Sequence, residues 1–388
     1  MFSSRLPASL AHNRIAVAVD ERRASAHAHG TPLFDLTETN PTVVGLSYPA
    51  AAIRAALAAP GALVYEPTPK GLPAARAAVA AYYARHGVTV DAERVTLTAS
   101  TSEAYAWLFK LLCDPGDEVL VPSPSYPLFD HLAALESVRP VAYPLRYHGG
   151  WFLDVEEVRR ALTPKTRAIL VVNPNNPTGS FLTRDEARAL ATLAAAHDLA
   201  LVSDEVFADY AYAPDPARAV TLAGDSPALT FCLSGLSKPV GLPQLKLGWI
   251  VTGGLPARVA EAEARLEHIA DTYLSVAAPV QHAAPALLAL VDDVGARILA
   301  RVRENRATLA AALAGSAAQL LDAQGGWSAV ARLPSTHTEE EWTLALLDQG
   351  VLVHPGFFFD LPPTTIVVSL LVAPATLAAA LPSLRALV

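Results

Sequence analysis

Short apolar runs alternate with longer alanine-rich segments along most of the chain. The longer segments, such as Ser102–Leu112 and Arg184–His197, have the length of helices. This alternation predicts an α/β fold: a three-layer α/β/α domain with a mostly parallel sheet, whose ligands gather at the C-terminal strand ends. The expected strands are Val95–Thr98, Glu118–Val121, Arg167–Val172, Ala200–Ser203, Leu229–Leu233 and Gly248–Val251.

The pattern changes after about residue 285. A long Ala/Leu/Arg segment, Val294–Ala314, is followed by isolated apolar runs. We therefore expect a large ligand-binding domain over residues 45–285 and a smaller α+β domain built from both chain ends, residues 1–44 and 286–388. Its expected strands lie near Trp327–Leu333, Val351–His354 and Ile366–Leu371.

Composition restricts the possible partners and location. The 388 residues are 52% hydrophobic and 17% charged, which indicates a globular chain with a large core. A formal net charge of −8 disfavours nucleic acid as a partner. Two cysteines in apolar segments, Cys113 and Cys232, are expected to be free thiols, as in a reducing compartment.

We also expect no membrane partner. The N-terminal residues lack the apolar block of a signal peptide. The uncharged stretch Leu361–Leu384 is interrupted by four prolines, so a buried strand, a turn and an alanine-rich helix are expected there. The predicted location is the cytoplasm.

Three residues in chain order indicate chemistry with pyridoxal 5′-phosphate (PLP). Lys238 lies in a loop of small residues, Asp204 ends an apolar run, and Asn176 precedes Pro177-Thr178-Gly179. The amine can form the imine with PLP and later move a proton, and the carboxylate can keep the pyridine nitrogen protonated. The amide can donate to the ring phenolate oxygen O3′.

A phosphate cup and a ring-stacking residue complete this hypothesis. Ser100, Thr101 and Ser102 follow a strand and open a helix, whose N–H groups and dipole attract a phosphate. An ordinary helix N-cap would show the same pattern. Tyr126, in a proline-stiffened loop, could stack on the pyridine ring, although a core or turn tyrosine fits equally well. We expect no metal ion at this site.

These motifs, together and in order, resemble the class I/II aminotransferase family of fold-type I PLP enzymes. The resemblance covers nearly the whole chain and includes Pro355-Gly356-Phe357 and Ser237-Lys238. It implies an internal aldimine on Lys238 and a phosphate held partly by Ser237. It also implies a homodimer with shared active sites, in which Tyr65 reaches the cofactor phosphate of the other subunit. Asn40 would lie near the substrate entrance.

Three positions depart from the family pattern. Where the family has an arginine that binds the phosphate, this chain has Lys246, which keeps the positive charge but cannot form two parallel hydrogen bonds. Where the family has a tyrosine that donates to O3′, this chain has Phe207. Loss of that donor should raise the pKa of the imine. Where the family has an arginine that binds the substrate α-carboxylate, this chain has Val367, which cannot form that contact. Either the substrate is an amine or an atypical amino compound, or another residue such as His354 supplies the cation.

The leading hypothesis is a PLP-dependent aminotransferase that passes an amino group from a small-molecule donor to a carbonyl acceptor. In this reading Lys238, Asp204 and Tyr126 are catalytic, and Asn40, Asn176 and His354 bind substrate. A lyase, decarboxylase or cyclising synthase would use the same site, because substrate contacts decide which bond breaks. A non-catalytic PLP-binding protein is the third possibility.

Overall fold

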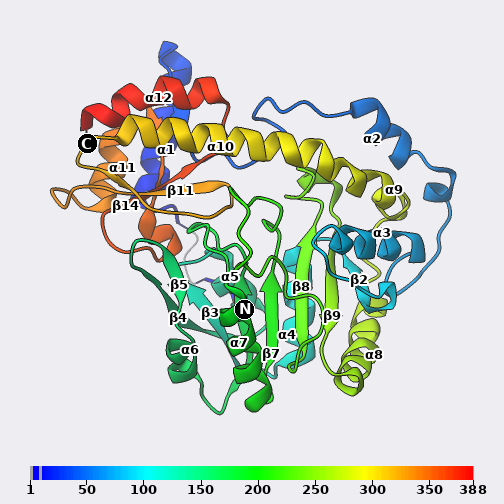
Figure 1. Ribbon diagram of the computed structural model, residues 1–388. Coiled ribbons are helices and arrows are strands. Elements are labelled where there is room, and N and C mark those ends of the chain that lie inside the picture. The colour runs from blue at the N-terminus through cyan, green and yellow to red at the C-terminus, as the bar shows by residue number, and fades with distance from the viewer. Residues whose placement is uncertain (1–2, 8–10, 388) are drawn as a thin grey trace.

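The computed structural model describes residues 3–7 and 11–387 and is built around an eight-stranded sheet (Figure 1). The strands, in their order across this sheet, are β2 (Val95–Thr98), β9 (Gly248–Gly253), β8 (Thr230–Gly235), β7 (Ala200–Asp204), β6 (Thr166–Val172), β3 (Glu118–Ser123), β4 (Arg139–Tyr147) and β5 (Trp151–Leu153). All six strands expected in this region are present, each within three residues of its expected ends.

The sheet is mostly parallel, as the sequence predicts, with antiparallel pairs near both edges. Neighbours from β8 through β7, β6 and β3 to β4 pair in parallel. In contrast, β9 is antiparallel to both β8 and β2, and β5 is antiparallel to β4. The connection from β8 to β9, residues 236–247, contains no crossover helix, and a parallel return would need one.

Both faces of the central strands are buried, which explains why they are apolar throughout. Successive side chains point to opposite faces: Val121 and Val202 pack on one side, and Leu120 and Leu201 on the other. The first face is covered by α4 (Thr101–Leu112), α5 (Leu128–Leu135) and α8 (Pro256–Tyr273). The second is covered by α6 (Val155–Ala161), α7 (Arg184–Ala196), α3 (Pro73–Ala84) and α9 (Ala278–Leu288).

The remaining elements form a second core beside the C-terminal edge of the large sheet (Figure 1). Its sheet has the order β10 (Gln319–Leu320), β11 (Ser328–Arg332), β14 (Thr365–Ser369), β13 (His354–Pro355). Nearby, β1 (Phe34–Asp35) pairs in parallel with β12 (Val351–Leu352), so the N-terminal segment joins this part. The helices of this part are α1 (Arg14–His29), α10 (Val294–Leu313), α11 (Glu339–Asp348) and α12 (Pro374–Leu387), whereas α2 (Ala50–Leu57) packs against α9 of the large domain.

The uncharged C-terminal stretch folds as expected, into β14 and α12. No helix of residues 3–7 and 11–387 combines the length and apolar character needed to cross a membrane. Cys113 and Cys232 are both free thiols.

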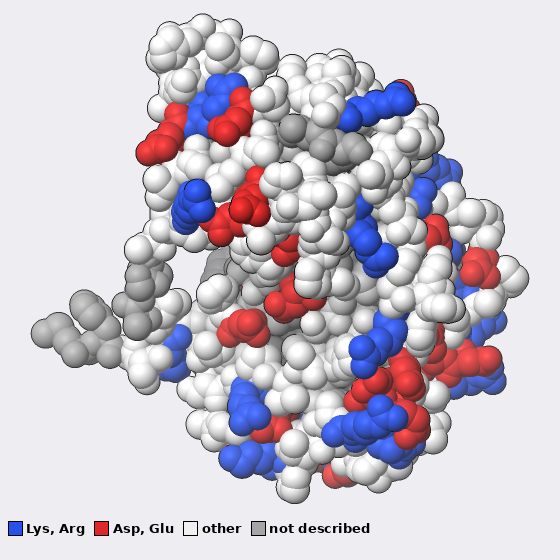
Figure 2. Space-filling view, turned by 90° about the vertical axis from the view of Figure 1, so that its left-hand side faces the viewer, with Lys and Arg blue, Asp and Glu red and all other residues white. Residues whose placement is uncertain are grey.

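Charged side chains of both signs intermingle on the face shown in Figure 2. Ion pairs of this kind occur along α6, where Glu157 lies 2.7 Å from Arg146 and Glu156 lies 3.2 Å from Arg159. Because these pairs are solvent-exposed, each contributes little to the stability of the fold.

One buried asparagine links α10 to the end of the C-terminal strand. The amide nitrogen of Asn305 donates to the carbonyl oxygens of Leu370 and Val372, both at 2.8 Å. Asn305 therefore satisfies two backbone acceptors that are buried away from water.

Replacing Asn305 by alanine should lower the free energy of unfolding by roughly 2–3 kcal/mol, because two buried carbonyls lose their donor. Urea unfolding measures the change. Glu304→Ala, at an exposed position on the same helix, is the control and should change stability by less than about 0.5 kcal/mol. Equal stabilities of the two variants would contradict the assigned role of Asn305.

Candidate active site

A cavity of about 310 Å³ lies where the C-terminal ends of β2, β3, β6, β7 and β8 meet. These ends share one edge because β2 runs antiparallel to β9, which in turn runs antiparallel to β8. The cavity brings together most residues that the sequence selected: Ser100, Thr101, Ser102, Tyr126, Asn176, Asp204, Phe207, Ser237, Lys238 and Lys246.

Two hydrogen bonds to its backbone carbonyl fix Lys238 in the loop after β8. The hydroxyl of Tyr210 donates to the carbonyl oxygen of Lys238 at 2.5 Å, and the Gly241 amide donates to the same oxygen at 3.1 Å. The ammonium nitrogen lies 5.0 Å from the ring centre of Trp327 and 5.6 Å from that of Phe207. Burial lowers the pKa of Lys238, and the nearby Asp204 charge partly opposes that shift. The environment therefore favours the neutral, nucleophilic amine.

Asp204 is buried at the end of β7 with two hydrogen-bond donors. The hydroxyl of Tyr105, on α4, donates to Oδ2 at 2.8 Å, and the Val206 amide donates to Oδ1 at 3.2 Å. Burial raises the pKa of Asp204, while these two donors and Lys238 oppose the rise. A protonated ring nitrogen of a bound ligand would give this carboxylate the cationic partner that a buried acid needs.

The adjacent Glu205 has a structural role. Its carboxylate accepts hydrogen bonds from the Ser203 and Thr221 hydroxyls at 2.9 and 2.6 Å and from the Leu222 amide at 2.7 Å. Because burial outweighs these donors, the pKa of Glu205 is raised to about 7.

The start of α4 forms the predicted cup. Ser100 is the N-cap, and its hydroxyl oxygen accepts the Glu103 amide at 3.2 Å, which leaves the hydroxyl proton free to donate. Thr101 and Ser102 also line the cavity, so hydroxyls and free helix N–H groups lie together. Lys246 adds a positive charge from the loop before β9. This arrangement suits a phosphate.

Only one of the three neighbouring asparagines faces the cavity. Asn173 binds backbone groups of Ala219 and Leu182, and Asn175 binds the hydroxyl of Thr178. Asn176 lines the cavity, and its Oδ1 accepts the hydroxyl of Ser328 at 3.4 Å.

Tyr126 lies at the rim of the cavity and is 40% exposed. Burial of part of the side chain and the Asp204 charge raise the pKa of its hydroxyl. Phe207 packs edge-on against Trp327, with ring centres 5.4 Å apart, so this wall is apolar.

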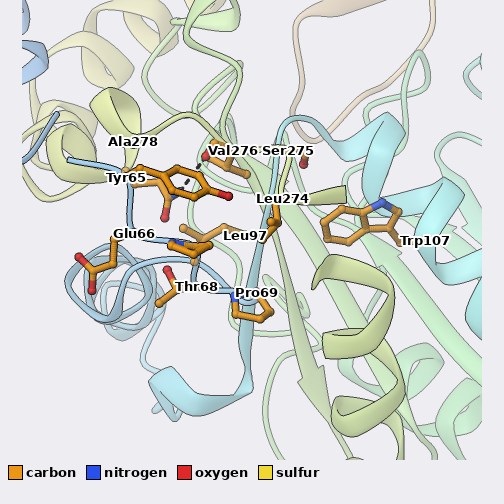
Figure 3. A pocket seen from close by; sticks show the side chains of 13 residues that line it. Tyr65, Glu66, Thr68, Pro69, Leu97, Trp107, Leu274, Ser275, Val276 and Ala278 are labelled. Atoms are coloured by element: carbon orange, nitrogen blue, oxygen red, sulfur yellow. Dashed lines mark hydrogen bonds between the residues drawn. The ribbon is translucent and has the colours of Figure 1, made fainter. Parts of the chain in front are cut away.

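Three predicted residues lie outside the cavity wall. Tyr65 is 80% exposed and borders a separate hollow beside Trp107 and Leu274 (Figure 3). Asn40 is exposed, and its Oδ1 accepts the amide and hydroxyl of Thr42. His354 packs against the rings of Phe358 and Phe359, and burial lowers the pKa of this histidine.

Several cavity residues carry no sequence signal that sets them apart. Tyr105 follows Thr101 by one helical turn, so its position near the cup could have been anticipated. Thr39 is next to the predicted Asn40. Trp327 and Ser328 come from β11 and the residue before it, and only the packing of the two sheets brings them here.

The residues present fit PLP. The cavity supplies an amine, a buried carboxylate, hydroxyls at a helix N-terminus, a second cation, an amide and an aromatic ring. These match the aldehyde, pyridine nitrogen, phosphate, phenolate oxygen and ring face of that molecule.

Several known proteins with similar sequences or structures are aminotransferases. Glutamate-pyruvate aminotransferase AlaA of Escherichia coli strain K12 is 33% identical over 216 residues, which cover 55% of this chain and 53% of that protein. The chain thus spans about half the length of this curated relative. A Thermus thermophilus aspartate aminotransferase mutant is 26% identical, with a TM-score of 0.86 and full coverage of both chains.

N-succinyldiaminopimelate aminotransferase from Mycobacterium tuberculosis also covers both chains fully, with 29% identity and a TM-score of 0.82. The model of the family described as aminotransferase class I and II matches residues 32–384. Because this match includes nearly all of the chain, the protein belongs to the class I and II aminotransferase family.

Proposed function

We propose that the protein is a PLP-dependent aminotransferase that moves an amino group from an amino acid or amine to a carbonyl acceptor. The observation that carries this proposal is the placement of Lys238 and Asp204 in one buried cavity beside the hydroxyl-rich start of α4. The names of the relatives support the reaction type.

The cavity lining supports the following division of roles. Ser100, Thr101, Ser102, Ser237 and Lys246 would hold the phosphate of PLP. Asn176 would bind its phenolate oxygen, and Tyr126 would cover the ring face. When bound, PLP supplies an electron-withdrawing ring that stabilises negative charge on the substrate carbon.

Asp204 and Lys238 perform the two acid–base tasks. Asp204, oriented by Tyr105 and the Val206 amide, keeps a proton on the pyridine nitrogen. Lys238, whose pKa is lowered by burial, attacks as a neutral amine. With PLP bound and the donor in place, the same amine would act as the base that takes the proton from the amine-bearing carbon and carries it to its next position.

The assembly and location are part of the proposal. Leu63, Val64 and Tyr65 form an exposed apolar segment, which supports a homodimer in which Tyr65 reaches the partner's phosphate cup. We assign residues 45–285 to the large domain and both chain ends to the smaller one. Asn40 and His354 would contact substrate, and the free thiols Cys113 and Cys232 support a cytoplasmic location.

Lys238→Ala should lower the rate of amino transfer by roughly 10³-fold or more, because nucleophile and base are lost together. Lys246→Ala is the matched control, since it removes a lysine from the same cavity. It should weaken PLP binding and leave transfer measurable at saturating PLP. Steady-state assays and PLP titrations provide both readouts.

Three results would contradict this account. Full activity of Lys238→Ala would exclude this lysine as the nucleophile. A wild type with no turnover, indistinguishable from Lys238→Ala, would favour a non-catalytic PLP-binding protein. Release of ammonia or carbon dioxide by the wild type, without a newly aminated acceptor, would favour a lyase or decarboxylase.

Tyr105→Phe should raise the pKa of Asp204, because the lost hydroxyl stabilises the ionised carboxylate. The acid limb of the pH–rate profile should therefore move to higher pH, and kcat on that limb should fall about tenfold for each pH unit of the displacement. Tyr143→Phe, which removes a buried hydroxyl bonded to the Leu170 carbonyl, should leave the limb in place. Identical profiles for the two variants would show that Tyr105 has no positioning role.

A further inference from the structure

We propose that the amino donor has no carboxylate on its amine-bearing carbon, and that Trp327 helps to select donors of this class. The inference rests on the proposed function and narrows its substrate. It starts from the charges that surround the cavity.

Among the described residues, only two cations line the cavity, and both already have tasks. Lys238 is the reacting amine, and Lys246 lies with the phosphate cup. The one anion of the wall is Asp204. A substrate carboxylate would therefore meet no unassigned positive side chain of this chain.

The wall contributed by the smaller sheet and its flanking segments is neutral. Thr39, Trp327 and Ser328 line this side, where Thr39 and Ser328 carry hydroxyls and Trp327 carries an indole whose nitrogen is buried. Neutral donors of this kind can bind a hydroxyl or carbonyl oxygen. They do not offset the cost of moving a carboxylate out of water.

The strand that could supply a cation is apolar at the relevant position. Val367 on β14 is 2% exposed and packs with Trp151, Leu321, Val330 and Leu361. Its neighbours in the sheet are Val330 on β11 and His354 on β13.

Neither of the nearest basic side chains changes this picture. Burial lowers the pKa of His354, which favours its neutral form, and its ring packs against two phenylalanines. Arg332 pairs with Thr365, two positions along β14 from Val367, and its guanidinium lies 5.8 Å from the ring centre of Tyr147.

Trp327 has the properties of a specificity determinant. It is buried against Phe207 and Tyr210, with ring centres 5.4 and 5.1 Å away, and its ring lies 5.0 Å from the Lys238 amine. Its indole nitrogen is buried and has no hydrogen-bond partner among the described residues. A neutral acceptor on the donor substrate, such as a hydroxyl, would satisfy this N–H.

The direct test compares donors that differ only in the group beside the amine. L-Phenylalanine, L-phenylalaninol and 2-phenylethylamine share one side chain, as do L-leucine, L-leucinol and 3-methylbutylamine. Each is mixed with the PLP-loaded protein without acceptor, and conversion of the bound cofactor is followed by absorbance. We expect the second-order rate constant of this conversion to be about tenfold or more higher for the donors without a carboxylate than for the amino acids.

Binding provides a second readout that needs no turnover. Calorimetric titration of the PLP-loaded protein should show 3-phenylpropan-1-ol binding at least about tenfold more tightly than 3-phenylpropanoate. Tighter binding of the anion would overturn the inference.

The outcomes separate this inference from the proposed function. If the amino acids react as fast as the matching amino alcohols and amines, or faster, the inference is overturned and the aminotransferase assignment stays intact. If no donor converts the bound cofactor, the proposed function fails and the inference with it.

Trp327→Phe tests the selected residue by removing the N–H and keeping an aromatic ring. It should raise KM for L-phenylalaninol about fivefold more than for 2-phenylethylamine, because only the alcohol carries an acceptor. Trp151→Phe is the control, since its buried indole nitrogen also lacks a partner but lies outside the cavity wall. Equal changes for both donors in Trp327→Phe would reduce Trp327 to a packing residue.

Discussion

Burying the Asp204 carboxylate at the end of a central strand costs free energy that its partners must offset, and the site is arranged around this requirement. Tyr105 and the Val206 amide offset part of the cost. The rest would fall to a cation, such as the protonated pyridine nitrogen that PLP would bring into the cavity that Asp204 lines. Lys238 is subject to the opposite effect, because the same burial favours its uncharged form. One apolar environment thus prepares both groups for their tasks.

The cavity depends on two sheets that come together in the folded chain. The large sheet supplies the cup, the carboxylate and the lysine from loops at one edge. The smaller sheet supplies Trp327 and Ser328, and the hydroxyl of Ser328 bonds to Asn176 across the join. The groups that we propose for the chemistry therefore lie on the large sheet, and the part of the wall that we propose to discriminate between substrates comes from the smaller one. A neutral wall on that side is the physical basis for a donor without a carboxylate.

Much of this architecture could be predicted from the sequence, because strands buried on both faces are apolar throughout and their ends carry the polar motifs. The cup, Asn176, Asp204 and Lys238 were found in this way. The pattern did not reveal β4, since Pro140, Pro144 and charged ends are atypical of a strand inside a sheet. Helical spacing from Thr101 could have placed Tyr105 near the cup, but the sequence could not reveal Trp327 as a site residue. Its role comes from side-chain packing between elements distant in sequence, and it lies in no recognisable motif.

The most direct measurement is to load the protein with PLP, reduce it with borohydride and locate the modified lysine by peptide mass spectrometry. The chain contains five candidates: Lys70, Lys110, Lys165, Lys238 and Lys246. Our account predicts one pyridoxyl group per chain, on Lys238. Modification mainly at Lys246 or at one of the other three lysines would contradict it, because the buried amine facing Asp204 would then not be the reactive one.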